Sequence, residues 1–256
     1  MKTQTIYEFP LNERIRVFIR LEQLLLQLDH FTKGSAIFDK RAAVSVLLDI
    51  LQIFSRNDLK SELLKELDRH SKILQKIANS QAVDTQKLDI ILNDLNLTSK
   101  KLYQTNGKIG VNVMESDLFK SISQRSSIPG GTCSFDLPAF HYWLERDNNT
   151  QADDLSHWTK PFIEIRKAIN LILTFIRQSS TPTHEVAESG FFQLALDKSQ
   201  PYQLLIITLE KSLPCFAEVS GGKHRFTIRF MQPSPDNNRP SQFPQDTPFS
   251  LTRCLL

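Results

Sequence analysis

The sequence lacks the features that mark membrane-spanning, secreted or disulfide-stabilised proteins. Its most apolar stretches, near residues 168–176 and 204–209, fall far short of the ~18 uninterrupted apolar residues that a spanning helix requires. The first ten residues, MKTQTIYEFP, contain no apolar segment of a secretory signal. Three widely spaced cysteines form neither a disulfide framework nor a zinc ribbon, and they are typical of reduced thiols. We therefore expect a cytoplasmic protein with no membrane segment.

The common catalytic motifs are missing as well. The chain contains no G-x-S-x-G, no P-loop, no G-x-G-x-x-G, no H-E-x-x-H and no C-x-x-C, and its six histidines show no metal-ligand spacing. Cys133 with His141 would supply a nucleophile and a base, so an acyl-transfer enzyme remains a third hypothesis. We expect a protein that is not an enzyme, with no catalytic residue, metal site or cofactor.

What the sequence does contain is helical periodicity over its first two thirds. Of the 256 residues 40% are apolar and 23% charged, with a formal charge of +3, which is typical of a folded protein. In residues 11–177 apolar side chains recur at i, i+3, i+4 and i+7, as Leu21, Leu24, Leu25 and Leu28 do. The expected helices contain residues 21–28, residues 43–54, a segment capped by Asp58, a segment opened by Asp84, residues 115–125, a short helix capped by Ser134 or Asp136, and residues 159–177. Such amphipathic helices must form a bundle to bury their apolar stripes.

Extended structure is predicted after residue 180, where SSTPTHE interrupts the helical pattern. Runs rich in β-branched and aromatic residues follow, namely GFFQLALD, QLLIITLE, CFAEVS and KHRFTIRFM. Residues 218–223 have the composition of a tight hairpin. Residues 232–248 are rich in proline and predict a long loop before a closing strand at 249–255. The pattern of residues 3–9 is also typical of a strand, and we expect them to join this sheet.

These patterns predict an α+β protein with two domains. Residues 1–180 are expected to form the mainly helical domain, and residues 181–256 a small antiparallel β domain with a basic strand at 223–231. Because side chains alternate across a strand, the apolar residues of this segment share one face, and Lys223, Arg225 and Arg229 share the other. These charges span roughly 20 Å at ~3.3 Å per residue, which suits an extended peptide or a run of phosphates.

No acidic residue lies between residues 220 and 232 to neutralise the basic strand. Solvated charges on an exposed sheet face are the simpler interpretation, but two arginines so placed repel each other unless an anion binds them.

Other basic residues are weaker candidates for partner binding. Arg16 and Arg20 are neighbours on one helix face, and Glu13 is placed to offset part of their repulsion. Arg56 follows an apolar helical stripe, where a cation also suits the negative end of the helix dipole. His141 is predicted on the apolar face of its short helix, where a histidine is more often a hydrogen-bonded core or interface residue than a catalyst.

Several specific motifs are distributed along the chain: LNE at 11–13, ELLKELDR at 62–69, SIPGG at 127–131, SFDLP at 134–138, HYWL at 141–144, and SG at 220–221 with RF at 225–226 and IRFM at 228–231. Together they resemble those of the ZapD family, the Z-ring-associated cell-division proteins of Gram-negative bacteria. The resemblance runs essentially end to end. It implies a non-enzymatic, symmetric homodimer with a helical and a β domain. Such a dimer binds the carboxy-terminal tail of the tubulin-like GTPase FtsZ at the division site at midcell, and it cross-links and bundles FtsZ filaments.

The resemblance also implies which residues bind the partner. The family's basic surface, near the centre of the dimer, would include Arg20, Arg56, His141, Arg225 and Arg229, and we add Lys223, Arg16 and Arg125 to the predicted set. Asp117 stands where better-known relatives are expected to carry an arginine, with Arg125 or Lys120 as substitutes.

Binding of single-stranded nucleic acid through the same strand is the alternative function. Arginine and lysine on a sheet beside phenylalanine suit a single strand. However, the phenylalanines are predicted on the opposite face from the arginines, so they form no stacking platform, and a net charge of +3 is low for a polyanion binder. We therefore expect no nucleic-acid partner.

Overall fold

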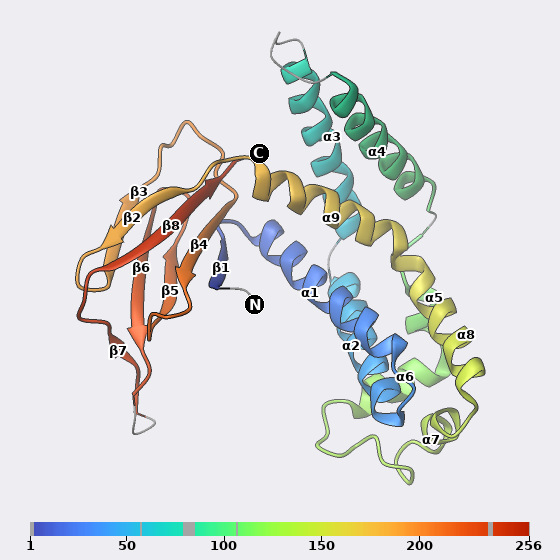
Figure 1. The fold of residues 1–256 in the computed structure, drawn as a ribbon. Helices are drawn as coiled ribbons and strands as arrows, with labels where there is room; N and C mark the ends of the chain where they lie inside the picture. The colour runs from blue at the N-terminus through green and yellow to red at the C-terminus, as the bar shows by residue number, and fades with distance from the viewer. Residues whose placement is uncertain (1–2, 57, 79–84, 106, 235–237, 256) are drawn as a thin grey trace. The chain divides into compact units, whose positions relative to one another are not determined.

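The fold is α+β, as predicted from the sequence. The computed structural model describes residues 3–56, 58–78, 85–105, 107–234 and 238–255 (Figure 1). By its contacts the chain forms two compact units, Met1–Phe18 with Leu173–Leu256 and Ile19–Ile172. The first helix and the last helix each contribute residues to both units, and each unit is described below by itself.

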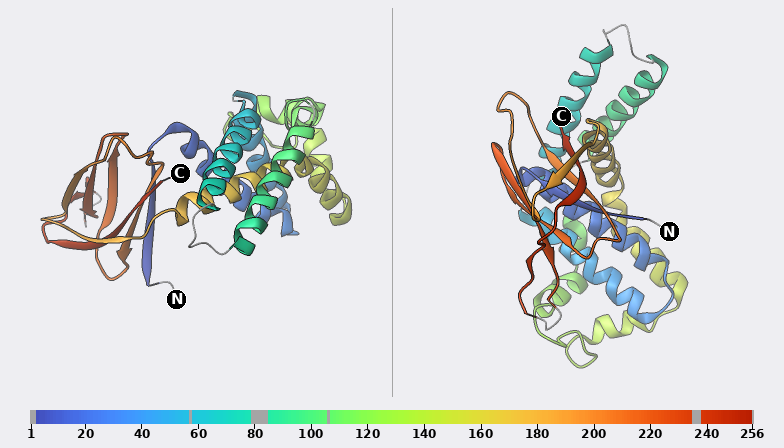
Figure 2. Two further views of the ribbon diagram at one scale, coloured as in Figure 1. Left: turned by 90° about the horizontal axis from the view of Figure 1, so that it is seen from above. Right: turned by 60° about the vertical axis from the view of Figure 1, so that its left-hand side comes forward.

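Amphipathic helices make up the unit Ile19–Ile172. They are α1 (Glu13–Lys33), α2 (Ile37–Arg56), α3 (Leu59–Ala78), α4 (Thr85–Gln104), α5 (Val111–Met114), α6 (Asp117–Arg125), α7 (Pro138–Leu144), α8 (Asn148–Thr159), the 3₁₀ turn η1 (Lys160–Phe162) and α9 (Ile163–Gln178). Leu21, Leu25 and Leu28 of α1 are buried, which confirms the stripe, although Leu24 is only half-buried. Helices α3 and α4 form an antiparallel hairpin whose two arms lie side by side in both views of Figure 2.

The helix caps were predicted with mixed success. Asp58 caps α3, since its Oδ1 accepts a hydrogen bond from the amide of Ser61 at 3.3 Å. The predicted cap at Asp84 lies outside the described residues. The prediction that Ser134 or Asp136 caps α7 is wrong: the helix starts at Pro138, whose fixed φ suits the first turn, and no side chain caps it.

Strands and the remaining helical turns make up the unit Met1–Phe18 with Leu173–Leu256. The strands are β1 (Gln4–Pro10), β2 (Thr183–Ala187), β3 (Phe191–Ala195), β4 (Leu204–Glu210), β5 (Phe216–Gly221), β6 (Arg225–Gln232), β7 (Ser241–Gln242) and β8 (Thr247–Cys254). They form two antiparallel sheets, sheet A in the order β1-β4-β8-β2 and sheet B in the order β3-β6-β5, with β7 also paired to β6. The expectation that the amino-terminal segment joins a sheet is confirmed, because Tyr7 of β1 is in register with Ile207 of β4.

The two sheets pack face to face, whereas the sequence suggested a single sheet. Leu205 and Ile207 of sheet A and Ile228 and Phe230 of sheet B have no exposed surface and belong to one apolar cluster. The Phe230 ring lies 5.1 Å from that of Phe249 across the two sheets. Since each sheet has one apolar face, stacking the sheets buries both faces at once.

A tight turn carries the chain from β2 in sheet A to β3 in sheet B. Its central residues, Ser189 and Gly190, have φ angles of 47° and 74°, the sign that a type I′ turn requires. The amide of Phe230 donates a hydrogen bond to the Gly190 carbonyl at 2.8 Å. The turn therefore fixes where β3 begins.

The other face of sheet A contacts the end of α9 within the same unit. Arg177 donates two hydrogen bonds to the Glu8 carboxylate, from Nε to Oε1 at 2.7 Å and from Nη2 to Oε2 at 2.9 Å. Cys254 is completely buried on this face. Burial raises the pKa of its thiol to about 12, and the nearby negative charge of Glu8 adds to the effect.

The raised pKa of Cys254 predicts a loss of stability at alkaline pH. The folded state keeps the thiol protonated. The contribution of this thiol to the free energy of unfolding is therefore fully present below pH 9.0, the ordinary pKa, and is lost as the pH rises to about 12. In this range the loss is ~1.4 kcal/mol per pH unit from this group. Urea unfolding of the native chain and of Cys254→Ala across this range measures it. The free-energy difference between the two proteins should shrink above pH 9.0, and parallel curves would contradict the assignment.

Candidate partner-binding surface

Strand β6 presents arginines on one face and its apolar residues on the other, as its alternation predicted. Phe226, Ile228 and Phe230 are at most 1% exposed, whereas Arg225 and Arg229 are exposed. In the described part of the chain neither arginine has a carboxylate within 4.0 Å. We call the exposed face of sheet B the basic sheet face. Because the phenylalanines of β6 point into the core, the strand itself offers no stacking platform, and the absence of a nucleic-acid partner stays a prediction.

The strand register shows the neighbours of each arginine. Arg229 lies opposite Phe191 of β3 on one side and Glu218 of β5 on the other, and Arg225 lies opposite Ala195 of β3. Phe191 is 38% exposed. Neither Phe191 nor Glu218 was predicted as part of this face, because both lie outside residues 220–232 and come beside Arg229 only through strand pairing. The hairpin turn was the available signal for Glu218, since a tight turn fixes which residues face each other.

Lys223 belongs to the turn before β6 and not to the strand. The strand begins at Arg225, and the amide of Gly222 donates a hydrogen bond to the Arg225 carbonyl at 3.0 Å. The predicted basic strand at 223–231 is therefore corrected to Arg225–Gln232. Because strand alternation applies only inside a strand, it does not place Lys223 on the same face as the arginines. Lys223 is exposed and remains a candidate on the basis of its charge alone.

The two candidate arginines of α1, Arg16 and Arg20, differ in their surroundings. Nη1 of Arg16 lies 2.9 Å from Oε2 of Glu13, one turn earlier, and both side chains are solvent-exposed. This pair confirms that Glu13 offsets the charge of Arg16, and it favours a plain surface role for Arg16. Arg20 is exposed and lies in the unit Ile19–Ile172.

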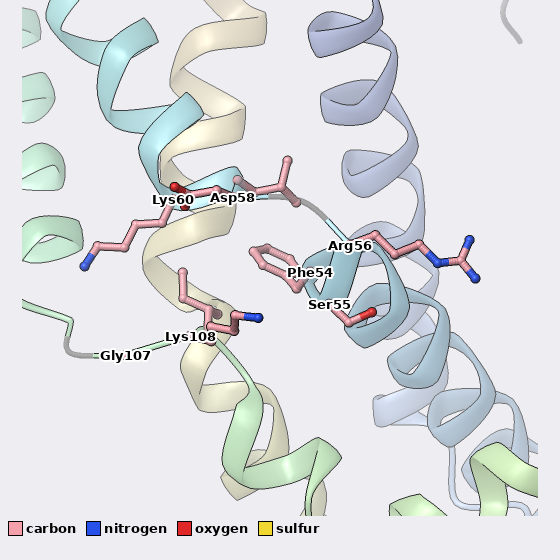
Figure 3. A pocket seen from close by; sticks show the side chains of 9 residues that line it. Phe54, Ser55, Arg56, Asp58, Lys60, Gly107 and Lys108 are labelled. Carbon is pink, nitrogen blue, oxygen red and sulfur yellow. The ribbon is translucent and has the colours of Figure 1, made fainter.

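Arg56 is the last residue of α2 and borders a cavity of about 250 Å³. Lys60 and Lys108 also line this cavity, and Figure 3 shows Arg56 and Lys60 extending to opposite sides of Phe54. The Lys60 ammonium donates a hydrogen bond to the Thr105 carbonyl at 2.5 Å, so this charge holds the end of α4 against α3.

One acidic residue, Asp58, lies among the cations that line this cavity. Hydrogen bonds from Ser61, first from its side chain and then from its backbone, lower the pKa of Asp58. The surroundings of Arg56 are basic, and Asp58 offsets part of that charge.

His141 is half-exposed, so its predicted place on the apolar face of α7 is corrected. The buried residues of this helix are Phe140, Trp143 and Leu144. The side chain of His141 is 45% exposed, and its Nδ1 lies 4.0 Å from Oε1 of Glu145. Leu137, which shared the predicted stripe with His141, precedes the helix, and the buried stripe runs instead through Phe140, Trp143 and Leu144. An exposed imidazole is accessible to a partner, which a core histidine would not be.

The comparisons with known proteins agree along the whole chain. A family model described as "ZapD: Cell division protein" matches residues 19–229. The chain belongs to the ZapD family. It is 48% identical over 256 residues to "Cell division protein ZapD" of Methylococcus capsulatus, with 100% of each chain covered. It is 38% identical to the protein of the same name from Nitrosomonas eutropha, covering 98% of this chain and 99% of that one. The protein of that name from Aromatoleum aromaticum is 37% identical, with 100% of each chain covered.

In this ZapD family member, Arg125 already has an acidic partner. Its Nη1 lies 2.8 Å from Oδ1 of Asp136, and this pair connects the end of α6 to the loop before α7. Asp117 lies in the first turn of α6, where a carboxylate suits the positive end of the helix dipole. Lys120 is exposed on the same helix. Of the two predicted substitutes for an arginine at position 117, Lys120 is therefore better placed to meet an anion.

The enzymatic alternative would pair Cys133 with His141. Cys133 is exposed, and among the described residues it forms no hydrogen bond with His141. Within the same described ranges no three histidine, cysteine, aspartate or glutamate side chains are grouped so that they could hold a metal ion. None of the described helices combines the length and apolarity needed to cross a membrane.

Proposed function

We propose that this ZapD family member is a non-enzymatic cell-division factor that binds the carboxy-terminal tail of FtsZ. As a homodimer it would cross-link and bundle FtsZ filaments at the Z-ring, in the cytoplasm at midcell. The observation that carries this proposal is the basic sheet face, where Arg225 and Arg229 are exposed and no described carboxylate lies within 4.0 Å of either. The family membership supports a role in cell division.

An anionic tail suits this face because it would pair with two exposed arginines that have no described acidic partner within 4.0 Å. They lie four residues apart on one strand, or ~13 Å, so an extended acidic peptide along β6 would meet both. Each exposed ion pair is worth only ~0.2–1 kcal/mol, so a single site would be weak and sensitive to salt.

Dimerisation would turn weak sites into a cross-link. A twofold dimer presents two identical sites, and once one tail is held in a filament, the second site binds at a high effective concentration. We assign dimerisation and part of the basic surface to the mainly helical residues 1–180, and the basic strand to residues 181–256. Bundling then depends on dimerisation more than on the affinity of a single site.

The predicted binding residues rank differently in the light of their contacts. Arg225 and Arg229 are the strongest candidates, followed by the exposed Arg20 and Arg56 and by the half-exposed His141, whose Nδ1 lies 4.0 Å from Oε1 of Glu145. Arg16 and Arg125 carry ion pairs with Glu13 and Asp136, and Lys223 lies in a turn, so we expect these three to contribute less.

Raising the salt concentration from low to physiological values should dissolve the bundles without dissociating the dimer. Salt screens exposed ion pairs, whereas apolar helix faces would hold the dimer. Light scattering of polymerised FtsZ with this chain measures the bundles, and analytical ultracentrifugation of the chain alone measures the dimer. Bundling that is indifferent to salt would contradict the electrostatic mechanism, and a monomer at all salt concentrations would contradict cross-linking by a dimer.

A further inference from the structure

We propose that the basic sheet face binds an acidic group of a peptide together with an apolar side chain beside it. Phe191 would provide the apolar contact, and Glu218 would restrict the side from which the acidic group approaches. This inference rests on the proposed function, because it specifies how the tail of the partner is recognised.

The geometry that supports this inference is a row of side chains across three strands. Phe191, Arg229 and Glu218 occupy paired positions on β3, β6 and β5. Adjacent strands are ~4.8 Å apart, so an apolar, a cationic and an acidic group share a face within about 10 Å. The row around Arg225 is different, because its neighbour on β3 is the small Ala195. Arg229 is thus the arginine with an apolar neighbour on one side and an acidic neighbour on the other.

The exposure of Phe191 is not explained by packing within the sheet. Its neighbour Phe192 supplies the core contact of this strand, with its ring 5.2 Å from that of Phe249. Phe191 points to the opposite face and remains 38% exposed. Aromatic side chains of this kind are common at the centre of binding surfaces, because they bury a large apolar area at a small entropic cost.

Phe191 is also held in place before any partner binds. It directly follows the turn at Ser189 and Gly190. The amide of Ser189 donates a hydrogen bond to the Asp246 carboxylate at 2.8 Å, and the side-chain amide of Gln242 donates one to the Ser189 carbonyl at 2.8 Å. Because the segment is fixed at its turn, a partner would not pay to order it on binding.

Glu218 makes the two sides of Arg229 electrostatically different. It lies directly across from Arg229, but the two side chains form no ion pair within 4.0 Å in the described part of the chain. A peptide carboxylate on the β5 side of Arg229 would be repelled by Glu218, whereas one on the β3 side would not. The favoured ligand therefore places its acidic group over Arg229 and an apolar side chain toward Phe191.

The test uses the full chain and a synthetic peptide of the FtsZ carboxy-terminal tail, with fluorescence anisotropy at several salt concentrations. Phe191→Ala should weaken binding ~5- to 10-fold with an unchanged salt dependence, since it removes apolar contact and no charge. Phe191→Leu should recover part of the loss. Val186→Ala, which shortens an exposed apolar side chain of β2 in sheet A and lies outside the basic sheet face, is the matched control and should bind as the native chain does.

Glu218→Gln should act in the opposite direction. Removing this charge should strengthen peptide binding ~2- to 5-fold at low salt and steepen its salt dependence, because the field of Arg229 is no longer partly cancelled. A scrambled peptide of the same composition keeps the charge but loses the order of the residues. It should bind the native chain more weakly than the original peptide does, and it should bind Phe191→Ala and the native chain equally well.

The outcomes separate this inference from the proposed function. If the native chain binds the peptide but Phe191→Ala and Glu218→Gln bind equally well, the inference is wrong and the proposed function stands. If the native chain does not bind the peptide, both are wrong. Equal loss in Val186→Ala, or displacement of the peptide by a single-stranded oligonucleotide at equal concentration, would also overturn the inference.

Discussion

Replacing both Arg225 and Arg229 with glutamate should abolish pelleting of this chain with polymerised FtsZ and leave the dimer intact. The double variant removes two attractive contacts per site and adds two repulsive ones. At ~0.2–1 kcal/mol each, the four changes weaken a site by about 1–4 kcal/mol, and a cross-link needs two sites. Both side chains are exposed and pair with no described carboxylate within 4.0 Å, so the fold should tolerate the change.

A matched control separates the local effect from that of net charge. Lys198 and Lys211 are exposed in loops of the same compact unit, outside the paired residues of sheet B. Lys198→Glu with Lys211→Glu changes the charge by the same amount and should leave pelleting unaffected. Equal loss in the control would show that only net charge matters, and full pelleting of the double arginine variant would place the site elsewhere. Sedimentation velocity must show an intact dimer in both variants.

The sequence predicted which face of each element is buried more reliably than it predicted what that face packs against. The alternation in β6 correctly placed Phe226 and Phe230 inside and Arg225 and Arg229 outside, since a period of two depends only on local geometry. It did not show that the strands form two stacked sheets, because alternation tells which residues are buried but not against what.

The elements missed from the sequence are those with weak apolar patterns. Helix α8 buries only Gln151 and Leu155, so it has no continuous stripe, although Asp147 caps it by accepting a hydrogen bond from the Thr150 amide at 3.0 Å. Strand β2 reads THEVA and lies in a segment that we predicted only as a helix break. Its pairing with β8 is what makes it a strand.

Of the candidate site, only the two arginines could be predicted from the sequence. Arg225 and Arg229 could be predicted from one strand, but Phe191 and Glu218 join them through pairing with two others. Phe191 is far from β6 in sequence, and its position depends on the turn at Ser189 and Gly190. Tertiary pairing, which no local pattern encodes, therefore determines the chemical environment of Arg229.

Gly190→Ala should lower the free energy of unfolding by more than ~2 kcal/mol. The φ angle of Gly190 is 74°, a conformation that costs an L-residue roughly 1–2 kcal/mol. A Cβ at this position would also clash with the carbonyl oxygen of Phe243, a backbone atom that cannot rotate away. The turn would have to shift, and with it the hydrogen bond from the Phe230 amide to the Gly190 carbonyl. Urea unfolding measures the loss.

Two further variants make the cause of this loss identifiable. Gly222→Ala introduces the same methyl group where no atom lies within 4 Å and φ is not positive, so its stability should stay within ~0.5 kcal/mol of the native chain. Ser189→Gly relieves the positive φ of 47° and should be neutral or slightly stabilising. If Gly190→Ala were as stable as Gly222→Ala, the turn would not be rigid. In that case the claim that Phe191 is fixed before binding would be wrong, even if charge reversal on β6 still abolished the capture of filaments.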